Sequence, residues 1–361
     1  LSPFAAYIPS VLASKVLTGV YDVQAYFFGV KGVFTNTTPT DAYRGAGRPE
    51  AIYVIERLMD YAARSLGEDP IALRRKNFIR SFPYTSATGE LYDVGDFDKV
   101  LDTALEKADA AGFARRKAES AAQGKLRGMG VCYYIESILG DQNETTKFEF
   151  AEDGGIDLYV GTQSNGQGHE TVFAQFLNDR LGVPFDKIRL VQGDSDRIAA
   201  GGGTGGSRSV TMQGSSIWGA ADEWIERAKP FAGEELEVAA ADVEFSDGAF
   251  RVAGTDKEID VMALVGRARA KGRPELLAEE KETVVPGRSF PNGCHICEVE
   301  VDPDTGDTHV VKYTVVDDFG VLMNPMLAEG QVHGGVAQGI GQALLEHVVF
   351  DEDGQLLSAS F

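Results

Sequence analysis

Cysteine is scarce in this sequence, which contains only three among 361 residues. Cys132, Cys294 and Cys297 are too few for a disulfide framework, so we expect reduced thiols in a cytoplasmic protein. Long apolar runs are also missing, because no stretch approaches the roughly 18–20 residues that a membrane span requires. The sequence therefore predicts neither a disulfide-rich secreted domain nor an integral membrane protein.

Positive charge is the second shortage. Lys and Arg total 34 against 55 Asp and Glu, which gives a formal net charge of −21. A surface this acidic repels nucleic-acid phosphates and anionic membranes, so neither is an expected partner. Glycine is abundant instead, with 42 residues. Such an excess indicates loops that bring the backbone close to a ligand.

The order of strand and helix signals predicts a mixed α+β fold of two domains, residues 1–105 and 106–361. An extended segment is expected at 18–35, followed by a helix that starts near Arg48 and has a proline in its first turn. A polar, Ala-rich helical stretch at 98–126 should connect the two domains. After it, glycine content and strand signals both rise.

The second domain is expected to contain three passages from a strand through a glycine loop to a helix. Segment 234–285 is interpreted as a variable, charged excursion. The expected strands and following helices are 156–160 with 169–181, 188–191 with a helix ending near Ala228, and the strand pair 296–301 and 309–316 with 328–346.

The first glycine loop contains Gly166-Gln167-Gly168 directly before a helix. Free backbone N–H groups and the positive end of the helix dipole make such a place a general anion site. The loop lacks the third glycine of a dinucleotide fingerprint and the Gly-Lys-Ser/Thr of a Walker loop. Taken alone, it is equally compatible with a tight turn.

The second glycine loop runs from Gly201 to Ser209 and has five glycines in its first six positions. The backbone entropy lost in ordering them is a cost that a plain connection has no reason to carry. Thr204, Ser207 and Ser209 add hydroxyl groups without bulk. This pattern favours binding of a pyrophosphate or a polar heterocycle, and a flexible linker is the alternative.

The remaining metal-ligating residues form no convincing site. Cys294 and Cys297 lie three apart in an expected strand, so their sulfurs should point to opposite faces, and no second Cys/His pair follows at zinc spacing. His169 and His333 lie in glycine-rich surroundings and are candidates for lining a site.

The expected helix 328–346 is unusually rich in glycine, at positions 330, 334, 335, 339 and 341. Each costs roughly 1 kcal/mol against alanine in a helix, so a backbone or a cofactor should approach closely. Gln331 and Gln338 lie seven residues apart, on one face, and present amide groups along it.

Four segments, taken together, resemble the molybdenum-binding large subunit of the xanthine dehydrogenase/aldehyde oxidase/carbon monoxide dehydrogenase family. They occur in the family's order and span about residues 30–361, nearly the whole chain. The segments are Ala42-Tyr43-Arg44-Gly45-Ala46-Gly47-Arg48-Pro49-Glu50, the run from Gly161 to Thr171, Thr204-Gly205-Gly206-Ser207-Arg208-Ser209, and the run from Gly330 to Gly339.

The resemblance implies a molybdenum–pterin cofactor, in its cytosine dinucleotide form, held non-covalently and without direct protein ligands to the metal. Gln167 would approach an oxygen on the molybdenum, and Arg44 would lie beside the metal. Tyr133, Gly45 and Ala46 would line the substrate pocket. Residues implied in binding the cofactor are Gly166, Gln167, Gly168, His169, Thr204, Gly205, Gly206, Ser207, Arg208, Ser209, Gln331 and Gln338.

The implied reaction is hydroxylation of an aldehyde or N-heterocycle C–H with oxygen derived from water. Electrons would leave through a [2Fe–2S] small subunit and an FAD medium subunit, in a dimer of heterotrimers. Three cysteines are too few to hold such a cluster here, which agrees with its location on a partner. A non-catalytic cofactor-binding or assembly paralogue remains an alternative, as does an unrelated dinucleotide-binding enzyme. The substrate itself is left open.

The chain resembles this family as a piece truncated at both ends. Residues 1–105 would be the C-terminal part of a first molybdopterin-binding domain, and 106–361 a second one lacking its end. The family's Gly-Glu-Gly/Ala loop, which bears the base glutamate, is expected downstream, since Gly89-Glu90-Leu91 and Gly233-Glu234-Glu235 lack its context. A pterin-binding loop is expected upstream. Gly45 also stands where carbon monoxide dehydrogenases carry a copper-binding cysteine.

Overall fold

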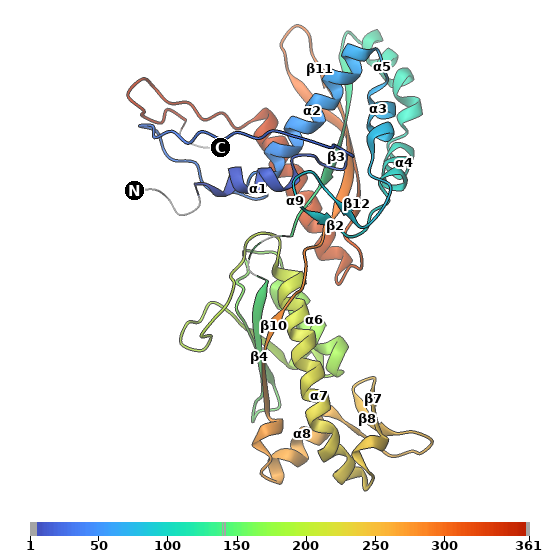
Figure 1. Cartoon of the computed structure of the whole chain (residues 1–361), viewed down its shortest axis with the longest axis vertical. Coiled ribbons are helices and arrows are strands. Elements are labelled where there is room, and N and C mark those ends of the chain that lie inside the picture. The colour runs from blue at the N-terminus through green and yellow to red at the C-terminus, as the bar shows by residue number, and fades with distance from the viewer. Residues whose placement is uncertain (1–5, 139, 141, 359–361) are drawn as a thin grey trace. The chain divides into compact units, whose positions relative to one another are not determined.

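The computed structural model describes residues 6–138, 140 and 142–358 (Figure 1). The chain divides into two compact units. Unit 1 comprises residues 1–138, 289–321 and 333–361, and unit 2 comprises 139–288 and 322–332. Both mix helices and strands, which confirms the expected α+β class.

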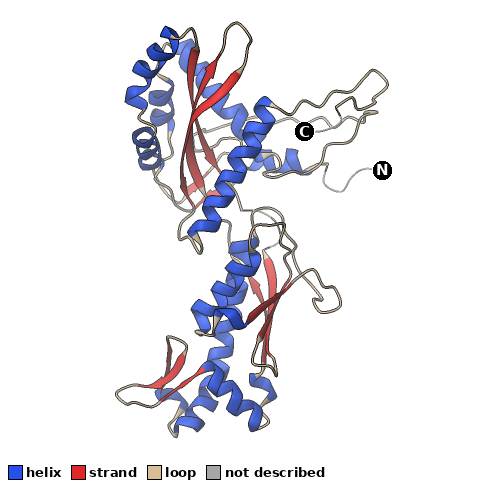
Figure 2. Ribbon diagram, turned by 180° about the vertical axis from the view of Figure 1, so that it is seen from behind, coloured by secondary structure: helices blue, strands red, loops and turns tan. Residues whose placement is uncertain are grey.

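Unit 1 is built on a three-stranded antiparallel sheet, in the order β12 (Thr308–Asp318), β11 (Asn292–Val301), β3 (Leu126–Ile135). Strands β11 and β12 contain the expected strand pair, so that prediction is confirmed. Helices α4 (Phe97–Lys107) and α5 (Phe113–Ala122) lie along one side of the sheet (Figure 2). The apolar face of α4 closes a core with the inward residues of β3 and β11.

The stretch expected to be helical over 98–126 is helical for most of its length, but it consists of two helices and does not connect the two units. A short 3₁₀ turn, η1 (Ala110–Gly112), separates α4 from α5. Asp109 adopts a left-handed backbone conformation (φ 48°), and its carboxylate accepts a hydrogen bond from the N–H of Gly112 at 3.2 Å. Both helices pack within unit 1 rather than forming a free connection. Apolar residues of α4 at helical spacing join its core, and Arg116 of α5 pairs with Glu298 of β11.

The N-terminal part of unit 1 is mainly helical, with the small hairpin strands β1 (Tyr84–Thr85) and β2 (Leu91–Tyr92). Helix α2 starts at Arg48, as the sequence predicts. The extended segment expected at 18–35 forms no strand, and its pairing is limited to one isolated bridge between Tyr21 and Phe78. The helices of this part are α1 (Ile8–Val16), α2 (Arg48–Leu66) and α3 (Pro70–Asn77).

Unit 2 is built on a four-stranded sheet in the order β10 (Ala278–Val284), β4 (Asn143–Phe150), β5 (Ile156–Val160), β6 (Ile188–Val191). Strands β5 and β6 run parallel, and both match their expected ranges. Helix α6 (His169–Leu181) also matches its expected range, because glycines in the left-handed conformation cap both ends. Helix α7 (Gly214–Leu236) packs beside α6 (Figure 1) and continues eight residues past the expected end.

Segment 234–285 is more ordered than the sequence suggests. Its buried positions, Phe250 and Leu264 among them, join the core around Trp224 of α7, and β10 is an edge strand of the main sheet. The apolar residues of these short elements are separated by charged residues, so the sequence pattern does not reveal that they form a core. They are β7 (Val243–Ser246), β8 (Ala249–Val252), β9 (Glu258–Asp260), α8 (Val261–Ala270) and the 3₁₀ turns η4 (Ala240–Asp242) and η5 (Pro274–Leu276).

The expected domain boundary at 105/106 is not a boundary between the compact units. Strand β3 follows it in sequence but pairs with β11, ten residues of each strand lying opposite one another within unit 1. Helix α9 (Pro325–Leu344) begins in unit 2 and continues into unit 1, and none of its residues is buried. Within the described residues, no helix combines the length and apolarity needed to cross a bilayer.

Candidate functional site

The two glycine loops of unit 2 are held directly against each other. Gly161 ends β5, and a Cβ at this position would lie 2.4 Å from Cα of Gly201. The N–H of Gly203 donates to the carbonyl of Gly161 at 3.2 Å. The hydroxyl of Thr204 accepts from the N–H of Gln163 at 2.9 Å and donates to its carbonyl at 2.5 Å. Glycine at 161 and 201 therefore permits an interlocked pair of loops.

The first of these loops delivers the backbone to the N-terminus of α6. Gly166 and Gly168 both adopt left-handed conformations, with φ of 99° and 81°, that other residues rarely accept. Leu327 of α9 packs against Gly168, 2.8 Å from where a Cβ would be, so the turn is supported from below. Asn324, just before α9, donates its amide to Gln175 of α6 at 2.8 Å. The positive end of the α6 dipole is thus presented by a fixed turn.

The side chain of Gln167 turns back onto its own loop. Its Oε1 accepts from the N–H of Asn165 at 2.5 Å, and its Nε2 lies 3.0 Å from Nε2 of His169. An amide nitrogen can only donate, so this contact requires His169 Nε2 to accept and places the imidazole proton on Nδ1. The second amide proton of Gln167 is not used in this pair of contacts.

His169 lies beneath the loop rather than lining an open site. The ring is 1% exposed and stacks on Phe173 at 4.6 Å between centroids. Burial lowers the pKa of His169 below its ordinary value, so the ring is neutral at pH 7. His169 therefore holds the side chain of Gln167 in place through this hydrogen bond.

The second glycine loop ends in two unusual backbone turns. Gly206 and Ser207 are both left-handed, with φ of 70° and 60°. Ser209 then opens a π-helical turn, η3 (Ser209–Gln213), before α7 begins. Strained non-glycine residues and π-turns recur at ligand sites, where surrounding structure holds them in place. The hydroxyl groups expected from the sequence are thus carried by a fixed backbone.

Arg208 differs from its neighbours because it is buried. Its Nη1 donates to Glu144 Oε2 at 2.6 Å and to the carbonyl of Gly203 at 3.0 Å, and its Nη2 donates to the carbonyl of Asn143 at 2.8 Å. The Arg208 and Glu144 side chains are 1% and 0% exposed. The guanidinium therefore binds protein groups, and a contact between Arg208 and the cofactor stays a prediction.

A cofactor with a pyrophosphate fits what unit 2 presents. Two buried polar atoms near the loops, Oγ1 of Thr162 and Nδ1 of His169, have no hydrogen-bond partner among the described residues. A Cβ added at Gly166, Gly203 or Gly205 would have no atom within 4 Å, so there is open space beside these glycines. Backbone N–H groups, hydroxyls and a helix N-terminus are donors suited to an anion.

The turn around Arg44 in unit 1 is held by a second buried arginine. Arg48 is 3% exposed, pairs with Glu136, and donates to the carbonyls of Gly45 at 2.7 Å and Ser137 at 2.8 Å. Gly45 has φ 88° and Ala46 has φ 29°, an uncommon angle for a residue with a Cβ. The turn that contains the two expected pocket residues is consequently strained and anchored.

Arg44 itself extends to helix α9. Its Nη1 would lie 3.2 Å from a Cβ at Gly334, and its Nη2 3.6 Å from one at Gly335. Two glycines of α9 thus admit the guanidinium of a side chain, and the predicted approach of a backbone or a cofactor stays a prediction. Gln338 lies one turn beyond Gly334, on the same helix face, and is half-buried, whereas Gln331 is exposed in the part of α9 that belongs to unit 2.

Comparison with known proteins shows that these loops belong to matches with one kind of domain. Molybdopterin cofactor-binding domain models match residues 1–78 and 103–361, which together include every motif described above. The chain belongs to the molybdenum-binding large subunits of the molybdenum hydroxylase family. This family includes carbon monoxide dehydrogenase and the xanthine and aldehyde oxidoreductases.

Relatives of this molybdenum hydroxylase chain match almost all of it. The nicotine 6-hydroxylase large subunit of Paenarthrobacter nicotinovorans is 35% identical over 97% of the chain and 45% of its own length. The carbon monoxide dehydrogenase large chain of Hydrogenophaga pseudoflava is 35% identical over 95% of the chain and 45% of its own length. The chain thus spans about half the length of these relatives.

Solved structures agree with the sequence match. Quinoline 2-oxidoreductase from Pseudomonas putida 86 superposes with a TM-score of 0.88, at 32% identity, over 99% of this chain and 48% of the other. The mixed fold with molybdopterin-binding domains is therefore that of the family.

Tyr133 has a different place from the one that its motif suggests. The ring is 1% exposed and packs edge-on against Phe78 and Phe97, with its hydroxyl 3.0 Å from Asn292 Oδ1. Burial raises the pKa of Tyr133 above its ordinary value. A ring enclosed on both faces offers no surface for a substrate to stack on, so we assign Tyr133 to the core of unit 1.

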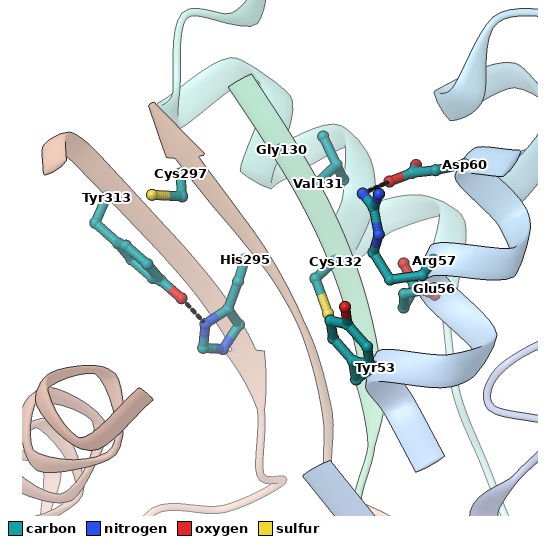
Figure 3. A pocket seen from close by; sticks show the side chains of 10 residues that line it. All are labelled: Tyr53, Glu56, Arg57, Asp60, Gly130, Val131, Cys132, His295, Cys297 and Tyr313. Carbon is teal, nitrogen blue, oxygen red and sulfur yellow. Dashed lines mark hydrogen bonds and ion pairs between the residues drawn. The ribbon is translucent and has the colours of Figure 1, made fainter. Parts of the chain in front are cut away.

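A cavity of about 250 Å³ lies in unit 1, between α2 and the open face of the sheet (Figure 3). None of the expected cofactor residues lines it. On its sheet side, His295 shares a hydrogen bond of 3.0 Å between Nδ1 and the Tyr313 hydroxyl, while the side chains of Cys132 and Cys297 point away from each other. Burial raises the pKa of both thiols. This cavity therefore presents un-ionised thiols rather than a thiolate metal site.

The cysteines of β11 behave as expected for a strand. Cys294 is buried in the core of unit 1, and Cys297 lies on the other face of the sheet, facing the cavity. Burial raises the pKa of Cys294 to about 12. Among the described residues, no group of three or more His, Cys, Asp or Glu side chains is arranged to hold a metal ion.

Sequence reasoning missed the two acidic residues that anchor the loops, Glu136 and Glu144. One signal for Glu144 was available, because it occupies the inward phase of β4, which continues with Thr146, Phe148 and Phe150. A carboxylate in an otherwise inward-facing series is seldom buried without a partner. The partner, Arg208, lies 64 residues away in sequence, so local pattern could not identify it.

Proposed function

We propose that this chain is the cofactor-binding part of a molybdenum hydroxylase that oxidises an aldehyde or an N-heterocyclic C–H with oxygen from water. The observation that carries the proposal is the interlocked pair of glycine loops at the N-terminus of α6, built from family motifs. Two relatives support the heterocycle class by their names, since one acts on nicotine and one on quinoline.

The cofactor would be the cytosine dinucleotide form of molybdopterin, bound without covalent links. Its pyrophosphate would be held by backbone N–H groups and hydroxyls of the second loop, including Gly206, Ser207 and Ser209. In a chain with net charge −21, fixed backbone dipoles supply the positive potential that surface lysines elsewhere would supply. Gln331 and Gln338 would contribute amide groups from α9.

When bound, the cofactor would supply oxygen transfer to the substrate and accept two electrons. Gln167 would orient an oxygen of the cofactor through its second amide proton, held in position by His169 and the N–H of Asn165. Arg44 would lie beside the reacting centre, and Gly45 and Ala46 would leave room for the substrate. The base that removes a proton would come from a glutamate outside this sequence.

The working enzyme would include partners for electron transfer. We propose a [2Fe–2S] small subunit and an FAD medium subunit, in a dimer of heterotrimers, because relatives are described as large subunits of complexes. The three cysteines are consistent with a reducing compartment such as the cytoplasm. A cofactor-binding paralogue without turnover is the second candidate, since Tyr133 does not face a substrate.

Cofactor analysis of the intact complex tests the proposal. We expect molybdenum and an acid-released cytidine nucleotide in equal amounts, without copper. Copper has no soft ligand at position 45, where glycine replaces a cysteine in a left-handed backbone conformation. Adenosine in place of cytidine, or copper bridged to molybdenum, would contradict the proposal. Molybdenum without turnover on aldehydes and N-heterocycles would favour the non-catalytic paralogue.

A further inference from the structure

We propose that the buried Arg208–Glu144 pair sets the shape of the second glycine loop, with Arg208 acting as a positioning residue and not as a ligand of the cofactor's phosphates. The identity of the ligand bound by this loop rests on the function proposed above. The shape of the loop is independent of that function, because it follows from contacts within unit 2.

Arg208 joins three backbone segments through one planar group. It donates to the carbonyl of Gly203 inside the glycine loop, to the carbonyl of Asn143 at the start of β4, and to the carboxylate of Glu144. A Cβ at Gly202 would lie 2.4 Å from the guanidinium carbon, so the loop backbone rests directly on this side chain. The guanidinium therefore contacts the backbone of residues 202 and 203 and determines its path.

Glu144 extends the same support to the first loop. Its Oε2 accepts from Arg208 and from the N–H of Gly202 at 3.4 Å, and its Oε1 lies 2.5 Å from where a Cβ would stand on Gly161. Both glycine loops thus meet one carboxylate, and both require glycine at the point of contact.

A buried charged pair costs desolvation free energy, so its presence here calls for a structural reason. Burying two charges costs several kcal/mol each before their attraction is counted, and an apolar pair is often as stable. A guanidinium, however, has five donors in a fixed fork, whereas a lysine has a compact point charge. The fork lets Arg208 donate to the carbonyls of Gly203 and Asn143 and to Glu144 at the same time.

Unit 1 repeats the arrangement independently. Arg48 is buried, pairs with Glu136, and donates to the carbonyl of Gly45 in the turn that carries Arg44. The two glutamates, Glu136 and Glu144, are eight residues apart in sequence and follow β3 and begin β4 respectively. The turn at Gly45 and the second glycine loop are therefore each shaped by an arginine of their own motif and a glutamate from this one stretch of chain.

The test compares variants in two measurements. Arg208→Lys keeps the charge and removes the fork, Glu144→Gln keeps the shape and removes the charge, and Arg189→Lys alters an exposed pair with Asp153 in the same unit as a control. Amide hydrogen exchange at residues 161–163 and 201–204 is measured on the cofactor-free chain. Molybdenum and cytidine content is measured in the intact complex.

For Arg208→Lys and Glu144→Gln we expect loop amides to exchange about tenfold faster in the cofactor-free chain. Cofactor affinity should fall about 10–100-fold, the range seen when groups that orient ligating residues are removed. Arg189→Lys should match wild type in both. Unchanged exchange in the cofactor-free Arg208→Lys chain would overturn the positioning role, and a cofactor loss limited to Arg208→Lys would then identify a phosphate ligand.

The two proposals fail separately. A wild-type complex without a cytidine nucleotide would refute the proposed function, yet the exchange measurement would still decide how the loop is shaped. If Arg208→Lys unfolds, Glu144→Gln supplies the same measurement, because glutamine has the size of glutamate but lacks the negative charge that holds the guanidinium. Normal loop exchange in folded Glu144→Gln would also contradict the proposal.

Discussion

At the scale of single residues, the three arginines of the family motifs divide into two kinds. Arg44 is exposed and lies against glycines of α9, whereas Arg48 and Arg208 are buried on the carbonyls of their own loops. The motifs alone do not distinguish these three arginines. Burial distinguishes an arginine that can meet a ligand from one that shapes the loop around it.

Gln167 is the residue whose change should affect chemistry most directly. In the intact complex, Gln167→Ala should lower turnover about 10²–10³-fold, because a donor aimed at developing charge contributes only in the transition state. The fold should survive, since the hydrogen bonds described for this side chain are local, to the N–H of Asn165 and to His169. Steady-state kinetics with thermal unfolding measures both.

The matched control for this change is Gln123→Ala, at the exposed end of α5. It should leave turnover and unfolding temperature unaltered. If Gln167→Ala keeps full turnover, or loses it only through unfolding, Gln167 is a turn residue and its proposed contact with the cofactor is wrong.

At the scale of secondary-structure elements, glycine has two different roles. Gly161 and Gly201 allow β5 and the second loop to touch, while Gly205 has open space around its missing Cβ. Glycines of the first kind are fixed by a neighbour. Glycines of the second kind leave room that a ligand can occupy.

A pair of substitutions separates these two roles. Gly161→Ala should destabilise unit 2 by about 1–3 kcal/mol, the usual cost of forcing extra atoms into a packed place. The new Cβ would lie 2.4 Å from Gly201 and 2.5 Å from Glu144 Oε1. Gly205→Ala, on the exposed part of the loop, should change the free energy of unfolding by less than about 0.5 kcal/mol.

Denaturant unfolding of the two variants measures this difference. The backbone at Gly161 and Gly205 is not left-handed, so conformational strain does not confuse the comparison. Equal stability of the two variants would mean that the loops are not in contact at Gly161. A cofactor affinity reduced by Gly205→Ala alone would place the ligand over that glycine.

At the scale of the whole molecule, the chain is two units, and each of them carries motifs of the family. Unit 1 holds Arg44 and the strained turn, and unit 2 holds Gln167 and the interlocked loops. The chain spans 45% of the length of nicotine 6-hydroxylase large subunit. This relative therefore contains more polypeptide than these 361 residues.

Residues 1–361 purified alone should show no catalytic turnover. No Gly-Glu-Gly or Gly-Glu-Ala run, which carries the family's base glutamate, occurs in the sequence. Lack of a general base should remove about 10²–10⁴-fold of rate. Retention of a non-covalent cofactor should also weaken when part of its cleft is missing.

Molybdenum content and dye reduction with a panel of aldehydes test this prediction, and the intact complex is the control. Stoichiometric molybdenum with catalytic dye reduction by the isolated chain would show that the base lies within these residues. Glutamates of the described loops would then be the next candidates for substitution.

The sequence by itself determined the elements that local signals define. Helix α6 and strands β5 and β6 have their expected bounds, because glycine caps and short apolar runs act over a few residues. The family motifs were also readable, since their order along the chain is a property of sequence alone.

Tertiary structure decided which of those residues are exposed and which are buried. Segment 18–35 has an extended pattern but finds no strand to pair with, and a strand exists only through its partner. Tyr133 enters the core because α4 covers its face of the sheet. Arg208 is buried because a glutamate 64 residues earlier neutralises it, and a charge leaves water only where folding brings such a partner.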